Sequence, residues 1–240
     1  MISQLSADAE MELMHQLKQF DTPSITNVVA TYPKKKDLCL GLYDPWHGKW
    51  YTDQSLKCIY PSLERRVGHV VTAVYGLPDP SVDRLGFTDI LEAVHAVGQP
   101  VILCLKQDMP EDIKNRNGLV GGLMANALKK AGATGLISDG PSRDIDEIRE
   151  LDFQYMLTGI CAGHGYFSVK AVNVPVHICG MDVCPGEMIH MDENGAVKFP
   201  RQRLADIYNL ACTLRDVEAE RISRIKAADG IDALVRVWAY

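Results

Sequence analysis

Apolar residues recur at helical spacing near the start of the chain, and they predict a helix over residues 7–20 that is capped by Ser6. The apolar positions of this helix are Met11, Leu13, Met14, Leu17 and Phe20. The segment 21–24 contains Pro23 and breaks the pattern, and a second short helix is expected to run through Val28 and Val29. The chain therefore opens with helices.

The middle of the chain alternates short apolar runs with amphipathic segments. Strands are predicted over residues 67–75, 101–105, 134–138, 153–158 and 174–178. Helices are predicted over residues 88–97, 121–130, 144–151 and, at the C-terminus, 201–225. Turns at 184–187 and 192–195 flank short β segments. This alternation predicts an α/β fold with parallel and antiparallel strands and with N- and C-terminal helices.

Residues 32–63 are the least regular segment and are expected to form an elaborated loop or a short hairpin. The segment is rich in aromatic side chains, namely Tyr43, Trp46, Trp50, Tyr51 and Tyr60. Such a loop suits a pocket wall or a subunit contact, and packing onto the core is the alternative.

Length and charge narrow the class of protein. A chain of 240 residues, 47% of them hydrophobic, can bury one large core, so a single domain over 1–240 is expected. The net charge of −6 argues against nucleic acid as a partner, and Lys34–Lys36 is a lone basic triplet that suits a solvated turn. The N-terminus lacks the features of a signal peptide and no apolar run is long enough to span a membrane, so a cytoplasmic protein is expected.

The seven cysteines are scattered and include no CxxC pair. We expect reduced, mostly buried thiols in a reducing compartment, rather than a thiolate metal site.

Two segments carry candidate chemistry. Gly121 and Gly122 stand where a loop enters a helix, so a ligand can approach the backbone and an anion is favoured by the free N–H groups. A simple tight turn is the alternative. Asp139, Arg143 and Asp144 follow the next strand, at the end where ligands collect in open α/β sheets. A helix cap at Asp144 with Arg143 in a surface ion pair is the alternative.

Together these residues suit a small 2-oxo acid such as a pyruvyl group. Arg143 offers a planar fork for a carboxylate, and Asp144 offers hard oxygen ligands for a divalent cation. The cation would stabilise an enolate as a Lewis acid.

Four motifs resemble the RraA-like family, which includes regulator of ribonuclease activity A and the class II 4-hydroxy-4-methyl-2-oxoglutarate aldolases. They are GGLM at 121–124, GATGLISDGPSRD at 132–144, VNVPV at 172–176 and CPGEMIHMDENG at 184–195. The resemblance is clearest over residues 118–200, weaker over 22–29 and 66–72, and absent over 32–63, which is treated as an insertion.

The resemblance implies a compact mixed-sheet fold like the swivelling phosphohistidine domain, in trimers or dimers of trimers with the site at a subunit boundary. It implies that Asp144 holds Mg²⁺ or Mn²⁺ and that Arg143 contacts the pyruvyl group. The helix-start amides of Gly121, Gly122, Leu123 and Met124 would hold the substrate carboxylate.

One position departs from the family pattern, which is an acidic residue, twenty intervening residues and then Arg-Asp. The acidic position, which in the aldolases helps to hold the water that serves proton transfer, falls on Gly122. Asp139 is a candidate substitute, and His164 is a candidate acid or donor to a substrate oxygen. For His164 and His190 a structural histidine is the alternative, and it is the preferred one.

The function expected from the resemblance is a metal-dependent carbon–carbon lyase that cleaves a 4-hydroxy-2-oxo acid or decarboxylates oxaloacetate through a pyruvate enolate. The alternative is a non-catalytic regulator that binds a ribonuclease. Gly122 favours the alternative, because glycine offers only its backbone.

Overall fold

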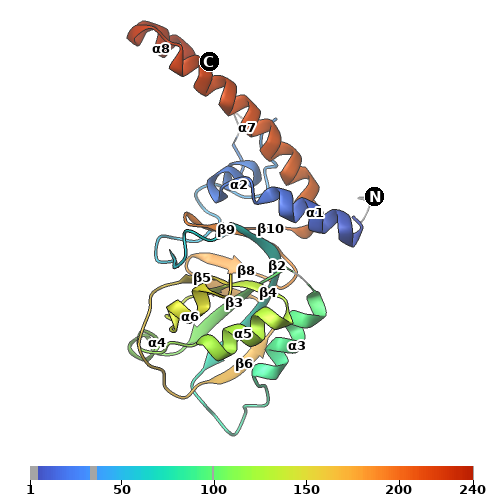
Figure 1. Ribbon diagram of the computed structural model, residues 1–240, viewed down its shortest axis with the longest axis vertical. Coiled ribbons are helices and arrows are strands. Elements are labelled where there is room, and N and C mark those ends of the chain that lie inside the picture. Colours follow the sequence, from blue (N-terminus) through green and yellow to red (C-terminus); the bar gives the residue numbers. More distant parts are fainter. Residues whose placement is uncertain (1–4, 33–36, 99, 240) are drawn as a thin grey trace.

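A mixed, nearly closed sheet forms the centre of the computed structural model, which describes residues 5–32, 37–98 and 100–239 (Figure 1). The strands lie in the order β1-β5-β4-β3-β2-β9-β10, and β6 pairs with β2. The parallel strands are β2 (Arg66–Gly76), β3 (Val101–Asp108), β4 (Ala133–Ser138) and β5 (Gln154–Leu157).

Antiparallel strands complete this sheet on both sides. They are β1 (Lys57–Cys58), β6 (Ser168–Val172), β9 (Met188–Asp192) and β10 (Gly195–Phe199). A separate antiparallel pair is formed by β7 (Val176–Ile178) and β8 (Met181–Val183). The predicted α/β fold with both strand directions is confirmed, and its likeness to the swivelling phosphohistidine domain stays a prediction.

Helices connect the parallel strands. They are α3 (Phe87–Val97), the short α4 (Glu111–Lys114), α5 (Gly122–Ala131) and α6 (Ile145–Arg149). The start of β3 is buried because both of its faces are covered. Leu103 packs in the cluster that contains α3 and α5, whereas its neighbour Ile102 packs in the cluster that contains β7 and β8.

A second layer at the far side of the sheet consists of α1 (Ala7–Leu17), α2 (Thr22–Val29) and α7 (Leu204–Lys226), which share a core with β9 and β10. The predicted cap is confirmed, because the Ser6 hydroxyl accepts a hydrogen bond from the Ala9 N–H. Helix α1 is three residues shorter than expected. A 3-10 turn, η1 (Arg201–Arg203), precedes α7.

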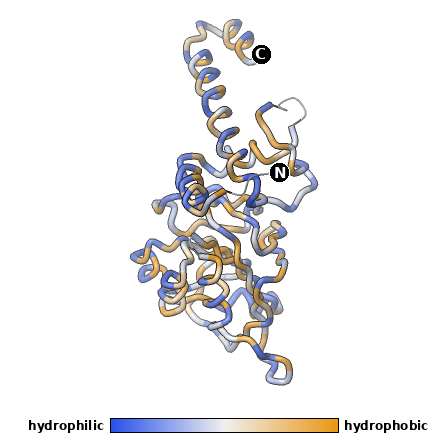
Figure 2. Tube along the Cα trace, turned by 90° about the vertical axis from the view of Figure 1, so that its right-hand side faces the viewer, coloured by the Kyte–Doolittle hydropathy of each residue, from blue (hydrophilic) through white to orange (hydrophobic). Residues whose placement is uncertain are grey.

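The C-terminal end of α7 and a helix that was not predicted, α8 (Gly230–Ala239), project away from the body of the molecule (Figures 1 and 2). The apolar side chains of α8 and Ile225 of α7 line a cleft of about 500 Å³. Ile231, Val235 and Trp238 are exposed. Helix α8 therefore presents an apolar surface to solvent.

Only part of the described segment within residues 32–63 packs onto the core, and Trp46 and Tyr51 are exposed. Trp50 and Tyr60 are buried, and Tyr43 stacks on Trp50 with ring centroids 5.3 Å apart. The lysine triplet at 34–36 lies outside the described residues. The expectation of mostly buried thiols was wrong, since only Cys104 and Cys179 of the seven are buried. No described helix is long and apolar enough to cross a membrane.

Candidate active site

Two loops meet where β4 ends and α5 begins. Ser142, in the turn after β4, is fully buried and its hydroxyl donates to the Val120 carbonyl at 2.9 Å. The Val120 N–H donates back to the same hydroxyl at 3.1 Å. Tyr155 of β5 donates a hydrogen bond of 3.0 Å to the Val120 carbonyl. Burial raises the pKa of its phenol, so it stays a donor. These bonds fix the turn against the entrance of α5.

Asp144 is the residue that joins the two loops at the surface. Its carboxylate Oδ2 accepts a hydrogen bond of 2.9 Å from the Gly122 N–H, while its backbone is left-handed with φ of 59°. Aspartate tolerates this conformation better than most residues, yet it still costs free energy. The side chain stays about one third exposed, so the carboxylate can also reach a ligand from solvent.

The two glycines leave room for two carboxylates. A Cβ on Gly121 would fall on Oδ2 of Asp144 and against Nε of Arg143. A Cβ on Gly122 would fall on the carboxylate of Glu147. The close approach explains why this helix starts with glycine, although the φ of Gly121 is extended. The sequence prediction missed Glu147, and its three-residue spacing from Asp144 was the available signal.

Arg143 lies beside this carboxylate, with Nε 3.6 Å from Oδ2 of Asp144. This Nε is buried, and no described residue offers it a hydrogen-bond acceptor. The next two backbone N–H groups, those of Leu123 and Met124, also have no acceptor within the described ranges, as expected for a first helical turn. The structure thus brings together the predicted residues 121–124, 143 and 144.

Asp139 points to a different place. Its carboxylate lies 2.6 Å from Nζ of Lys106 and 3.6 Å from Nζ of Lys114, and it accepts a hydrogen bond of 2.7 Å from the Gln107 N–H. The side chain is only 7% exposed. The two lysines compensate the negative charge of Asp139 within the fold. Its role as a substitute for the missing acid stays a prediction.

His164 lies in an exposed loop that borders the site. The loop is tied to the entrance of α5, because Gly118 N–H donates to the Gly163 carbonyl at 2.9 Å. The ring Nδ1 of His164 lies 2.9 Å from the carbonyl oxygen of Gly165, and the ring is tilted against Phe167. His164 is therefore near the cleft, but the contact of Nδ1 is local. His190 is fully buried between Thr22 and the Leu17 carbonyl, as expected of a structural histidine.

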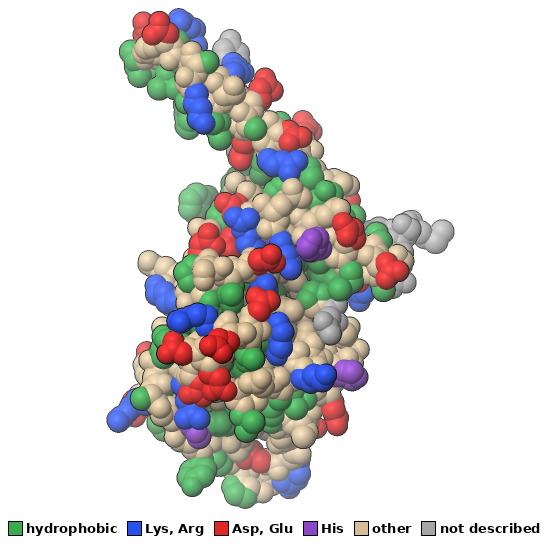
Figure 3. Space-filling view, in the orientation of Figure 1, with side chains coloured by type: hydrophobic (Ala, Val, Ile, Leu, Met, Phe, Trp, Pro, Cys, Tyr) green, Lys and Arg blue, Asp and Glu red, His purple; other side chains and the backbone are tan. Residues whose placement is uncertain are grey.

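An open cleft of about 580 Å³ lies beside Arg143 and Asp144. It is lined by Arg143, Asp144, Ile145, Asp146, Glu147, Ile160, Cys161 and Ala162. Figure 3 shows acidic side chains gathered on the face that carries α5 and α6. Within the described part of the chain, no three His, Cys, Asp or Glu side chains are grouped as a ready metal site.

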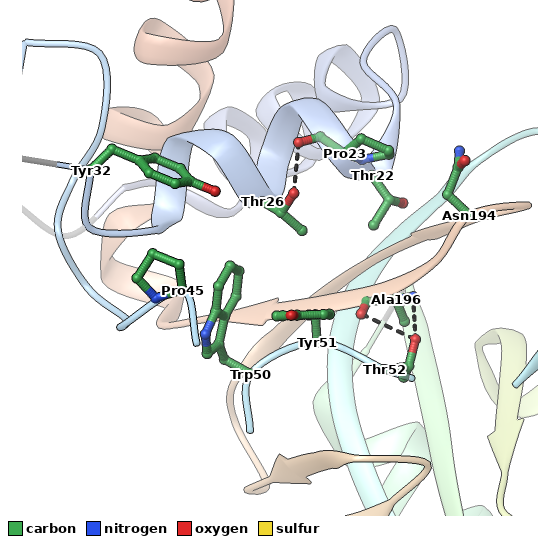
Figure 4. Close-up of a pocket in the computed structure, with 10 residues that line it drawn as sticks. All are labelled: Thr22, Pro23, Thr26, Tyr32, Pro45, Trp50, Tyr51, Thr52, Asn194 and Ala196. Carbon is green, nitrogen blue, oxygen red and sulfur yellow. Dashed lines mark hydrogen bonds between the residues drawn. The ribbon is translucent and has the colours of Figure 1, made fainter. Parts of the chain in front are cut away.

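A second cavity of about 330 Å³ lies at the other side of the molecule, between α2, β10 and the aromatic segment (Figure 4). Tyr32, Trp50 and Tyr51 form part of its wall. The aromatic segment thus lines a pocket as well as packing on the core. None of the predicted site residues borders this cavity.

The family model for RraA-like proteins, described as Aldolase/RraA, matches residues 40–198. The chain belongs to the RraA-like family. The match begins at residue 40 and so includes most of the segment 32–63, for which motif comparison indicated no resemblance. The description of this segment as an insertion stays a prediction.

Curated relatives match part of the chain. An uncharacterized protein of Methanocaldococcus jannaschii is 31% identical over 113 residues, which are 47% of this chain and 54% of that protein. The 4-hydroxy-4-methyl-2-oxoglutarate aldolase of Thermus thermophilus is 29% identical over 86 residues, which are 35% of this chain and 52% of the enzyme. The matches span about half the length of these relatives.

Among solved structures, an uncharacterized protein from Pseudomonas syringae pv. tomato shares the fold, with a TM-score of 0.71 at 19% identity. The likeness covers 100% of this chain and 97% of that one. It therefore includes the terminal helices as well as the sheet.

Proposed function

We propose that this RraA-like protein is a divalent-metal-dependent carbon–carbon lyase that acts on a 4-hydroxy-2-oxo acid or on oxaloacetate through a pyruvate enolate. The observation that carries the proposal is the position of Asp144, whose carboxylate is held over the glycine start of α5 beside the guanidinium of Arg143. The aldolase name of the Thermus relative supports the same reaction class.

The residues present fit Mg²⁺ or Mn²⁺ as cofactor. Asp144 supplies a carboxylate of which only Oδ2 has a hydrogen-bond partner among the described residues, and the cleft offers no thiolate cluster. Mg²⁺ is commonly bound through one or two carboxylates and otherwise by water, so a single side chain is sufficient. When bound, the ion would act as a Lewis acid on the 2-oxo group.

The substrate carboxylate is assigned to the backbone N–H groups of Leu123 and Met124 and to Arg143. The N–H groups point out of the first turn of α5, where the helix dipole favours an anion. The guanidinium of Arg143, whose Nε has no hydrogen-bond acceptor among the described residues, adds a positive charge on the same side. This arrangement would orient the 2-oxo group toward Asp144.

We further infer a homo-oligomer, a trimer or a dimer of trimers, with this site at a subunit boundary. Leu123, which is 88% exposed beside the two glycines, supports a partner surface at the site. The exposed apolar face of α8 supports a second contact.

The competing function, a non-catalytic protein that binds a ribonuclease, rested on the missing acid at position 122. The carboxylate of Glu147 lies where a Cβ at position 122 would be, so an acidic group is present in this part of the site, and this supports the lyase over the competing function. Capture of an endoribonuclease that survives Asp144→Ala would support the competing function.

Metal dependence of pyruvate release tests the proposal. Protein treated with a chelator is expected to release pyruvate from 4-hydroxy-4-methyl-2-oxoglutarate and oxaloacetate no faster than buffer, and Mg²⁺ or Mn²⁺ should restore release. Because the ions alone speed the decay of oxaloacetate, buffer with metal is the control. Release at the control rate under every condition would overturn the proposal.

A further inference from the structure

Glu147 brings a carboxylate into the cleft that the sequence did not point to. It belongs to the short helix α6, three residues after Asp144, so both side chains lie on one side of that turn. The three atoms nearest to a Cβ built on Gly122 are Cδ, Oε1 and Oε2 of Glu147. The glycine therefore admits this carboxylate to the start of α5.

A purely structural role for Glu147 would be a capping box, because Asp144 and Glu147 have the spacing of an N-cap and an N3 residue. The structure does not form one. The Asp144 side chain caps no N–H of α6, and its left-handed backbone differs from the extended conformation of an N-cap. Glu147 makes no hydrogen bond or ion pair with any described residue, whereas Asp146 in the same helix pairs with Arg149 at 3.2 Å.

The other candidate acids and bases already contact groups of the protein. Asp139 contacts Lys106, and Oδ2 of Asp144 contacts the Gly122 N–H. Of the described carboxylates that line the cleft, only that of Glu147 lacks a partner within the protein. A carboxylate that has no partner in the protein and lines the same cleft as Arg143 and Asp144 is suited to proton transfer.

We propose that Glu147 is the general base of this active site, an inference that rests on the proposed lyase function. Its carboxylate takes the proton of the 4-hydroxyl group of a 4-hydroxy-2-oxo acid. The C3–C4 bond then breaks, C4 becomes a carbonyl carbon, and the electron pair forms the C2–C3 double bond of the enolate. The proton on Glu147 returns to C3 and gives pyruvate.

The same geometry accounts for the departure at Gly122. The family pattern places an acid on the first turn of α5, whereas here the carboxylate comes from α6 across the cleft. A side chain at 122 and the present position of Glu147 exclude each other, because they would occupy the same space. An acidic side chain at position 122 is therefore expected to replace Glu147 as the base when Glu147 is removed.

The test compares two reactions in Glu147→Gln. Aldol cleavage needs a base to take the hydroxyl proton, whereas loss of CO₂ from oxaloacetate does not. Pyruvate release from 4-hydroxy-4-methyl-2-oxoglutarate should fall by about 10² to 10⁴ fold, the usual effect of a lost general base, and oxaloacetate decarboxylation should fall far less. Glu150→Gln, an exposed acid in the turn that ends α6, is the matched control and should change neither reaction.

Mn²⁺ binding, followed by electron paramagnetic resonance, gives a readout independent of turnover. Glu147→Gln should keep the affinity of the wild-type protein. A loss of about tenfold or more would show that Glu147 supports the metal, as a ligand or through a ligand, and would overturn its role as base. In the double variant Gly122→Asp/Glu147→Ala, aldol cleavage should recover relative to Glu147→Ala.

The outcomes separate the two proposals. Equal losses in both reactions, or no loss in either, with an active wild-type protein, would overturn the role of Glu147 and leave the lyase function standing. A wild-type protein that releases pyruvate from neither substrate would overturn the lyase function itself, and the base role with it.

Discussion

The carboxylate of Asp144 accepts a hydrogen bond of 2.9 Å from the backbone N–H of Gly122, across the gap between the turn after β4 and the first turn of α5. This contact places an acidic side chain at the positive end of a helix, which stabilises the charge. It also explains the left-handed backbone of Asp144, since the conformation is held by its neighbours.

Gly121→Ala should disable the site without a change in charge. The new Cβ would fall on Oδ2 of Asp144 and would push this carboxylate out of position. Displacement of a catalytic group by about 1 Å commonly costs around 100-fold in rate, so we expect a comparable loss of pyruvate release. Steady-state kinetics and Mn²⁺ binding measure the effect.

Gly159→Ala is the matched control, because a Cβ at Gly159 would meet no atom within 4 Å. It should keep the wild-type rate. If Gly121→Ala behaved like this control, the close approach of Asp144 to the helix start would be irrelevant to activity.

Arg143→Lys should weaken substrate binding. Lysine keeps the positive charge but loses the planar fork, and Nε of Arg143 is a donor that has no hydrogen-bond acceptor among the described residues. Hydrogen bonds to charged groups contribute about 1.5 to 3 kcal/mol, so KM for oxaloacetate should rise by roughly 10-fold to 100-fold.

For comparison, Arg149→Lys changes an exposed arginine of α6 that pairs with Asp146 at the surface. KM should not change in this variant. An unchanged KM in Arg143→Lys would exclude the arginine from the carboxylate site.

His190 should make stability depend on pH. Burial lowers its pKa from 6.5 to about 4, although the Asp192 carboxylate acts in the opposite direction. Between these values the unfolded chain binds more protons than the folded protein, so the free energy of unfolding falls as the pH is lowered from 6.5 toward 4. From pH 7 to pH 5 this group alone should remove about 2 kcal/mol.

Urea unfolding of the wild-type protein and His190→Gln at both pH values isolates this contribution. The variant should lose less stability than the wild-type protein over the interval, because glutamine does not titrate. Parallel losses in both proteins would show that folding does not lower the pKa of His190.

Much of the fold was predictable from local pattern. The continuous apolar run Val101–Leu105 indicated a strand covered on both faces, and β3 is such a strand. The paired glycines at 121 and 122 indicated the start of α5, and the polar turn after Ser138 indicated the end of β4. Both signals are local, and adjacent parallel strands bring their ends together.

Other features depended on contacts that local pattern does not encode. Glu147 enters the site because α6 lies across the start of α5. Its spacing of three residues from Asp144 indicated a shared side of the turn, but not the approach to α5. Asp139 was an attractive substitute in sequence, but the ammonium of Lys106 holds its carboxylate elsewhere.

Helix α8 had a helical signal in Ile231, Leu234, Val235 and Trp238 that the sequence prediction left unused.

The rate of pyruvate release from oxaloacetate by wild-type protein and Asp144→Asn, measured with Mn²⁺ and corrected for the rate in buffer with Mn²⁺, tests the central claim most directly. Asparagine keeps the size of the side chain and can still accept from the Gly122 N–H, but it removes the negative charge that would hold the cation. Because Lewis-acid stabilisation is worth several kcal/mol, the variant should lose about 100-fold or more in kcat/KM. Equal rates in the two proteins would contradict the assignment of Asp144 as the metal-binding residue of a lyase.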